Sequence, residues 1–313
     1  MKIALIIIIV ILALAVITFL AGLCYLASFV SLPKGKMGPS REWEEKFNFW
    51  RDFDKRRTVQ YQIKSFDGYE LHVEYVPNES APDPKKFVII SHGYTSTRYG
   101  ALKYLNKWME LGYNCVIYDD RHHGMNRADF FTPCTLGVKE SKDLMAVIDD
   151  TYRRYGEDIY LGLHGESMGS ALQITALKYK PKVHFIFNDC GFAEVTNVLK
   201  VGMCDIFHLP GWLIYPASFV CTILYGWSFT KNRPIDSLKD NTIPICFIHG
   251  EDDDFIRCSN SKEMAAANPA YSELHLFPGA KHAESMYKDE PRYLEIMKAF
   301  LNKVYEMEGN SCE

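Results

Sequence analysis

The residues best suited to chemistry are Gly165-Glu166-Ser167-Met168-Gly169, which lie between an apolar run rich in strand formers and a run that favours a helix. A G-x-S-x-G pattern in this setting is typical of a nucleophile elbow, a tight turn that lifts a serine hydroxyl away from the backbone. Glycines leave room for the turn, and the following helix directs its first amides and positive dipole end toward the same point. The pattern predicts that Ser167 is a nucleophile.

A nucleophilic serine needs a base and an acid that orients the base. A strand-like run over 243–248 leads into the segment His249–Asp254, in which three aspartates compete for the orienting role. The pattern H-G-x-x-D, followed three residues later by an aliphatic residue, favours Asp253. Asp252 is the first alternative.

The base is expected just past the next strand, which we predict over 273–277. His282 follows that strand after a glycine-containing turn. One histidine among ten is most often structural, but the order Ser, Asp, His and the three loop positions favour a catalytic role. Ser167 would then attack the substrate, His282 would take and return the proton, and Asp253 would hold the imidazole tautomer.

Two backbone amides are expected to form an oxyanion hole. One is the amide of Met168, which directly follows the nucleophile. The other lies after a strand predicted at 86–90, where Gly93 allows close approach and Tyr94 carries the second amide. The Tyr94 ring would either line the acyl site or pack in its loop, and His92 is expected to be structural.

These motifs resemble the α/β-hydrolase superfamily, in particular small bacterial serine hydrolases and esterases with an N-terminal membrane segment. The segments that carry the resemblance are Phe66–Leu71, Ser91–Gly93, Asp119–Gly124, Gly165–Gly169, His249–Asp253 and Gly279–His282. The resemblance covers roughly residues 58–305. It implies a mostly parallel central sheet with helices on both faces, a small helical cap, and hydrolysis without a cofactor.

The order of predicted elements agrees with this α/β class, because strands alternate with helices after an opening hairpin. The strands are expected at 58–64, 70–75, 86–90, 114–118, 159–164, 183–188, 244–249 and 273–277. The helices are expected near 100–111, 138–155, 168–179, 259–267 and 290–305. One catalytic domain over 58–313 accommodates all of them.

A segment over about 192–240 lacks strand signals and is expected to be the cap. Its uncharged centre carries aromatic residues, of which Trp212, Tyr215 and Phe219 are the candidates for substrate contact. Prolines and glycines interrupt it, which argues against a membrane span. Lining of a substrate pocket, packing of the cap on the core, and contact with a bilayer surface remain as three interpretations.

The N-terminus is the second strong signal, because residues 3–30 contain no charged side chain. This length exceeds the roughly 20 residues that cross the hydrocarbon core. A cleaved signal peptide would have a shorter apolar region and a small-residue cleavage site. We therefore predict a transmembrane anchor over 3–30, a juxtamembrane linker over 31–57, and a single-pass membrane protein.

The side of the membrane is less well determined. Lys2 precedes the span, whereas Lys34, Lys36 and Arg41 follow it, which favours a cytoplasmic domain by the positive-inside rule. A very short leading tail is also common in anchors that export the domain behind them. Eight cysteines outside the span, without paired short spacing, favour a reducing compartment.

Other ligand classes are expected to be absent. The segment Asp119–His123 contains two histidines and three ionic side chains, but it lacks metal-ligand spacing, and Asp119 and Arg121 are expected to form internal ion pairs. A net charge of −4 gives no reason to expect nucleic acid. A small ester or acyl compound is the expected substrate, with no metal and no organic cofactor. Peptidase, thioesterase and non-catalytic binding functions are the alternatives.

Overall fold

The computed structural model describes residues 2–33, 35–205 and 207–309, so Lys34 of the charge argument lies outside the described residues. The strands are β1 (Val59–Lys64), β2 (Glu70–Val76), β3 (Lys86–Ser91), β4 (Asn114–Tyr118), β5 (Tyr160–Glu166), β6 (Phe185–Asp189), β7 (Ile245–Gly250) and β8 (Ser272–Phe277). The helices are α1 (Lys2–Ser31), α2 (Met37–Lys46), α3 (Leu102–Glu110), α4 (Glu140–Tyr155), α5 (Met168–Ala176), α6 (Val195–Asp205), α7 (Ile214–Tyr225), α8 (Ser259–Ala267), α9 (Ser285–Lys288) and α10 (Glu290–Met307).

The strands form one sheet in the order β1-β2-β4-β3-β5-β6-β7-β8. β2 runs antiparallel to both of its neighbours, and the pairs from β4 to β8 are parallel. Parallel strands place their carboxyl ends at one edge of the sheet, where ligands bind in open α/β sheets. Ser167 and Asp253 follow the carboxyl ends of β5 and β7.

Both faces of the sheet are covered, because successive strand residues point to opposite sides. In β3, Val88 and Ile90 pack with Trp108 of α3 and Phe300 of α10. Phe87 and Ile89 pack on the other face, with residues of α4, α5 and α8. Such double burial explains why the central strands are apolar at nearly every position.

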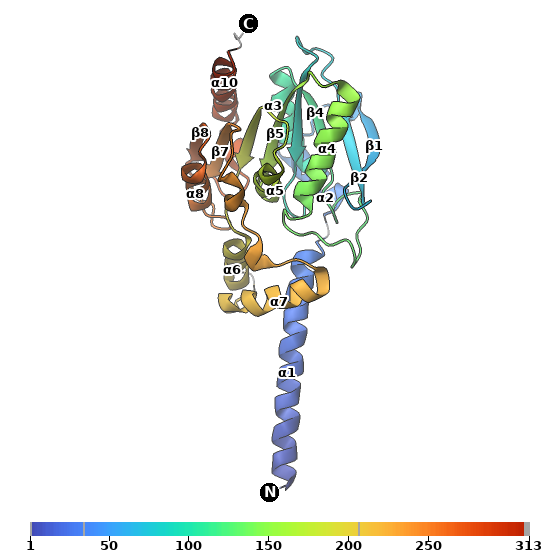
Figure 1. Ribbon diagram of the computed structural model, residues 1–313, viewed down its shortest axis with the longest axis vertical. Coiled ribbons are helices and arrows are strands. Elements are labelled where there is room, and N and C mark those ends of the chain that lie inside the picture. The colour runs from blue at the N-terminus through green and yellow to red at the C-terminus, as the bar shows by residue number, and fades with distance from the viewer. Residues whose placement is uncertain (1, 34, 206, 310–313) are drawn as a thin grey trace.

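Helix α1 projects from this body as a long rod (Figure 1). Its segment Ile3–Ser31 is 29 residues long and apolar enough to cross a membrane, and a signal sequence would pass the same test. Burial begins at Leu23, and Leu23, Leu26, Ala27 and Val30 pack against the cap, whereas Tyr25 and Phe29 on the same turns remain exposed.

The segment expected to be a linker over 31–57 is folded onto the body. It contains α2, and Phe49, Trp50 and Phe53 are buried in the core beside α3. The reason is that these aromatic side chains bury large apolar areas. The segment expected to be a linker thus contains a helix and aromatic side chains that pack on the body.

The cap consists of α6, α7 and short turns between β6 and β7. α7 has 12 residues, which is about 18 Å of helix and too short to cross the hydrocarbon core. It runs across α1 at the point where α1 enters the body (Figure 1).

Candidate active site

The sharp turn at Ser167 is made possible by close backbone contacts. Ser167 has φ 54° and ψ −114°, a conformation that L residues rarely adopt. A Cβ on Gly165 would lie 2.5 Å from the amide nitrogen of Ser170, and one on Gly169 would lie 2.1 Å from the carbonyl oxygen of Ser91. Only glycine fits at both positions, so the sequence pattern reflects crowding of the turn.

Three side chains from separate loops form one hydrogen-bonded chain. The Oγ of Ser167 lies 2.9 Å from Nε2 of His282, and Nδ1 of His282 lies 2.7 Å from Oδ2 of Asp253. The second carboxylate oxygen of Asp253 accepts hydrogen bonds from the amides of Phe255 and Ile256, at 3.0 and 2.8 Å. The three residues that the sequence selected are thus brought together in the order that base catalysis requires, and Asp252 points elsewhere as an exposed loop residue.

The acid and base loops are held to each other by backbone contacts. A Cβ on Gly250 would lie 2.4 Å from the carbonyl oxygen of Ala280, so the histidine loop passes directly over the end of β7. The amide of Asp252 donates to that carbonyl at 3.0 Å. This contact explains the glycine of the H-G-x-x-D pattern and fixes the separation of Asp253 and His282.

The charge on Asp253 is stabilised by its surroundings. Burial alone would raise the pKa of this carboxyl group, but hydrogen bonds with His249 and His282 and with the Ile256 amide outweigh burial and lower the pKa to about 2. The group is therefore an anion at neutral pH. A buried anion next to Nδ1 favours the tautomer in which Nδ1 carries the proton and Nε2 is free to accept one.

The expected oxyanion donors lie beside the nucleophile. Met168 is the first residue of α5, so its amide has no acceptor within that helix. A Cβ on Gly93 would lie 3.5 Å from Cβ of Ser167, which places the Gly93–Tyr94 peptide across from the hydroxyl. Both Tyr94 and Met168 line the same cavity as Ser167.

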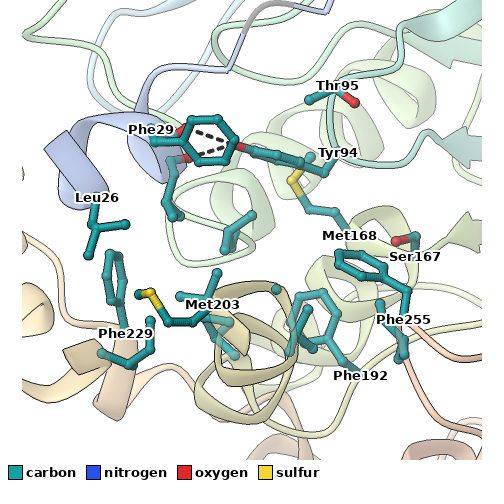
Figure 2. A pocket seen from close by; sticks show the side chains of 18 of the residues that line it. Leu26, Phe29, Tyr94, Thr95, Ser167, Met168, Phe192, Met203, Phe229 and Phe255 are labelled. Atoms are coloured by element: carbon teal, nitrogen blue, oxygen red, sulfur yellow. Dashed lines mark hydrogen bonds between the residues drawn. The ribbon is translucent and has the colours of Figure 1, made fainter. Parts of the chain in front are cut away.

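This cavity, called the acyl cavity below, has a volume of about 370 Å³ and is almost wholly apolar. Figure 2 shows Ser167 and Met168 at one end, and Leu26 and Phe29 of α1 at the other. The cap and neighbouring loops supply further wall residues: Phe192, Val195, Val198, Leu199, Met203, Phe207, Ile214, Phe229, Phe255 and Ile256.

The aromatic residues that the sequence analysis assigned to substrate contact lie elsewhere. Trp212, Tyr215 and Phe219 are 58%, 51% and 69% exposed, and they are not among the described residues that line the acyl cavity. They project from the outer side of the cap because the inner side of α7 is occupied by α1. Ile214 and Met203 take the expected place in the wall.

The end of α1 was not expected in the site. Leu26, Phe29 and Val30 line the acyl cavity. The Tyr94 hydroxyl donates to the carbonyl oxygens of Phe29 and Val30, at 3.0 Å each (Figure 2). The Tyr94 ring therefore both lines the cavity and holds the helix. In a uniformly apolar helix no periodicity marks the side that faces a cavity, so no pattern in the sequence identifies these residues.

A second, polar cavity of about 150 Å³ lies on the other side of His282. Lys103 forms a buried ion pair with Glu166, the variable residue of the elbow. Tyr287 and Glu44 complete the cluster, and burial raises the pKa of Glu44 to about 8. His282 thus borders both the apolar cavity and the polar cavity, an arrangement suited to an acyl chain and a polar leaving group.

The histidines near the sheet edge are structural. His92 accepts a hydrogen bond from the Asp120 amide at 3.0 Å, and burial lowers its pKa to about 4. His123 is also buried, with a pKa lowered to about 3. The expected ion pairs form, since Asp119 pairs with Arg98 and Arg121 pairs with both Asp67 and Asp143.

One group of possible metal ligands occurs in the described residues, at Cys246, Glu273 and His275. Glu273 already accepts hydrogen bonds from His275 and Tyr271, at 2.7 and 2.5 Å. Burial raises the pKa of the Cys246 thiol well above its usual value, which disfavours the thiolate that binds metals. The group fits a metal ion poorly and lies on β7 and β8, apart from Ser167.

No family model matches the chain. The uncharacterised protein YqkD of Bacillus subtilis is 27% identical over 270 residues, which cover 84% of this chain and 86% of that protein. A putative alpha/beta hydrolase, L404 of Acanthamoeba polyphaga mimivirus, is 23% identical over 210 residues, with coverage of 64% and 67%. YqkD matches this chain over most of the length of both proteins, but its name gives no activity.

Solved structures match the same part of the chain as a fold. The esterase Pf2001 of Pyrococcus furiosus superposes with a TM-score of 0.65 at 23% identity, over 81% of this chain and 96% of that one. The mouse alpha/beta hydrolase domain-containing protein 10 gives a TM-score of 0.58 at 17% identity, over 79% and 99%. At these identities the likeness establishes the fold.

Proposed function

Because the chain has the α/β-hydrolase fold that its sequence predicts, we propose that it is a serine hydrolase that cleaves carboxylic esters. The observation that carries the proposal is the chain of hydrogen bonds from Asp253 through His282 to Ser167, at the end of an apolar cavity. Esterases among the structures of the same fold agree with it.

In the proposed reaction, Nε2 of His282 takes the proton of the Ser167 hydroxyl as its oxygen attacks the ester carbonyl. The amides of Met168 and Tyr94 hold the oxyanion of the tetrahedral intermediate. The protonated imidazole gives its proton to the departing alcohol, and the acyl group stays on Ser167 Oγ. Water then attacks this acyl-enzyme, with His282 again as base, and releases the carboxylic acid.

In this proposal, two cavities bind the two parts of the substrate. The acyl chain occupies the acyl cavity, whose lining offers it almost no polar group. The alcohol departs toward the polar cavity formed by Glu44, Lys103, Glu166 and Tyr287. The roles assigned to Ser167, Asp253, His282, Tyr94 and Met168 are part of the proposal.

Labelling of the full-length protein by a fluorophosphonate probe tests the proposal, with Ser167→Ala as the matched control. We expect labelling of the wild type and complete loss in the variant. An ester, a thioester and an anilide with the same acyl group then separate esterase, thioesterase and amidase activity. A folded wild type that neither reacts with the probe nor hydrolyses any of the three would refute the enzyme assignment and favour a binding protein.

A further inference from the structure

We infer that the substrate is an acyl ester that resides in a lipid bilayer, and that its chain enters the acyl cavity sideways between α1 and the loop after α6. This inference rests on the proposed ester hydrolysis and adds the substrate class and its route. Four features carry it: the fixed attachment of α1, the depth of the cavity along α1, the outer face of the cap, and the rim of the cavity.

Helix α1 is attached to the body through three of its last four carbonyl groups. Such groups lack partners within a helix and must be satisfied from outside. The carbonyl oxygen of Ser31 accepts from the Cys134 amide at 2.9 Å, and those of the two residues before it accept from the Tyr94 hydroxyl. The fourth, that of Ser28, accepts from the Leu32 amide of the same helical turn. If α1 spans a membrane, the orientation of the body relative to that membrane is fixed.

The acyl cavity begins at the depth of the lipid head groups. Twenty residues from Ile3 reach Gly22 and cover the roughly 30 Å hydrocarbon core at 1.5 Å per residue. Burial by the protein starts at the next residue, Leu23. Leu26 and Val30 line the cavity and lie roughly 6 and 12 Å beyond Gly22. The ester groups of lipids lie at this boundary between hydrocarbon and water.

The outer face of the cap is suited to the same boundary between hydrocarbon and water. Tyr215, Phe219 and Ile223 recur every four residues on one side of α7 and are 51%, 69% and 68% exposed, and Trp212 lies just before them. Residues 209–227 contain no charged side chain. α7 lies across α1 where the projecting part of α1 begins (Figure 1), so the helix that carries these exposed residues lies beside the segment proposed to cross the membrane. Apolar and aromatic helix faces of this kind bind the bilayer interface.

The rim of the acyl cavity is a pair of rings that also reach the surface. Phe29 of α1 lines the cavity and is 46% exposed, and Phe207, half-buried in the loop after α6, lines it from the opposite side. Their ring centroids are 5.1 Å apart in an edge-to-face arrangement, and Tyr25 packs against both. Rotation of these side chains opens the cavity toward lipid, without a change in the backbone of the body.

A chain-length comparison in phosphatidylcholine vesicles tests the route. The full-length protein is assayed with water-soluble nitrophenyl butyrate and with nitrophenyl palmitate dissolved in the vesicles. Leu26→Trp places a larger side chain into the acyl cavity, whereas Leu20→Trp makes the same change on the same helix at a lipid-facing position that is 49% exposed. We expect the palmitate-to-butyrate rate ratio to fall about tenfold or more in Leu26→Trp only.

The outcomes separate the two proposals. An unchanged ratio in Leu26→Trp, or an equal decrease in Leu20→Trp, overturns the entry route. A wild type that hydrolyses butyrate but not palmitate overturns the lipid substrate and leaves ester hydrolysis intact. A wild type that hydrolyses neither ester and is not labelled by a fluorophosphonate refutes the proposed function, and with it this inference.

Fluorescence quenching tests the position of the cap independently of activity. Brominated phosphatidylcholine quenches tryptophan that contacts acyl chains. Trp212→Phe should remove much of the quenchable emission, whereas Trp43→Phe, a similarly exposed control on α2 at 47%, should not. Equal quenching of the wild type and Trp212→Phe would overturn contact of the cap with the bilayer.

Discussion

Replacement of Asp253 by asparagine is the sharpest probe of the site, because the structure dictates how the new side chain must sit. One carboxylate oxygen of Asp253 accepts from the amides of Phe255 and Ile256, at 3.0 and 2.8 Å. The asparagine oxygen can keep these two bonds. Its NH2 group must then face Nδ1 of His282, where the second carboxylate oxygen lies 2.7 Å away in the native protein.

This exchange reverses the direction of one hydrogen bond. An NH2 group donates, so Nδ1 must accept and the imidazole proton moves to Nε2. Nε2 then has no lone pair for the proton of Ser167, which lies 2.9 Å away. Loss of this tautomer control costs about 10⁴-fold in kcat in a triad of this kind, or about 5.5 kcal/mol of transition-state stabilisation.

The assay is the kcat for a soluble nitrophenyl ester, accompanied by the Tm of each variant. Asp252→Asn and Asp254→Asn are the matched controls, because both residues are exposed in the same loop. We expect a Tm close to that of the wild type for all three variants and a large loss of kcat for Asp253→Asn alone. A loss of less than tenfold in that variant, or an equal loss in Asp252→Asn, would refute the assigned orienting role.

Two further predictions concern stability. Gly169→Ala should lower the free energy of unfolding by about 3 kcal/mol or more, because the new Cβ would lie 2.1 Å from the Ser91 carbonyl oxygen. Thermal unfolding measures this change. The control is Gly38→Ala, because a Cβ at Gly38 meets nothing within 4 Å. An equal loss of stability in the control would refute crowding as the cause. Burial raises the pKa of Glu44 to about 8 from an ordinary 4.5, so its stabilisation is complete below about pH 4.5 and is lost as the pH rises through about 8. Glu44→Gln should flatten the Tm–pH profile in this window, and an unchanged slope would contradict it.

The features that sequence predicted well are those encoded by local geometry. The turn at Ser167 requires glycines at fixed positions, so the motif and the structure carry the same information. The strands of the parallel sheet are apolar on both faces and stood out for that reason, as in β3, which was expected at 86–90 and extends to Ser91. α8 occurs at the predicted residues, 259–267.

The features that sequence missed depend on which of two similar surfaces is covered. The aromatic residues of the cap could equally line a cavity or face outward, and only the docking of α1 against α7 decides that Phe219 is exposed while Ile214 is buried. Composition likewise could not show that Phe49 and Trp50, in the expected linker, pack beside α3. An apolar residue indicates that its side chain is buried, but it does not indicate which element covers it.

Helix α1 is more than a membrane tether in this molecule, because it forms part of the wall of the acyl cavity. A tether could be removed without effect on the site, but this helix supplies Leu26, Phe29 and Val30 to the cavity next to Ser167. Its removal would open that cavity and leave the hydroxyl of Tyr94, whose amide is a proposed oxyanion donor, without the carbonyl groups to which it donates. The apolar segment is therefore part of the candidate site. For the same reason, a truncated soluble domain would give a misleading measure of acyl preference.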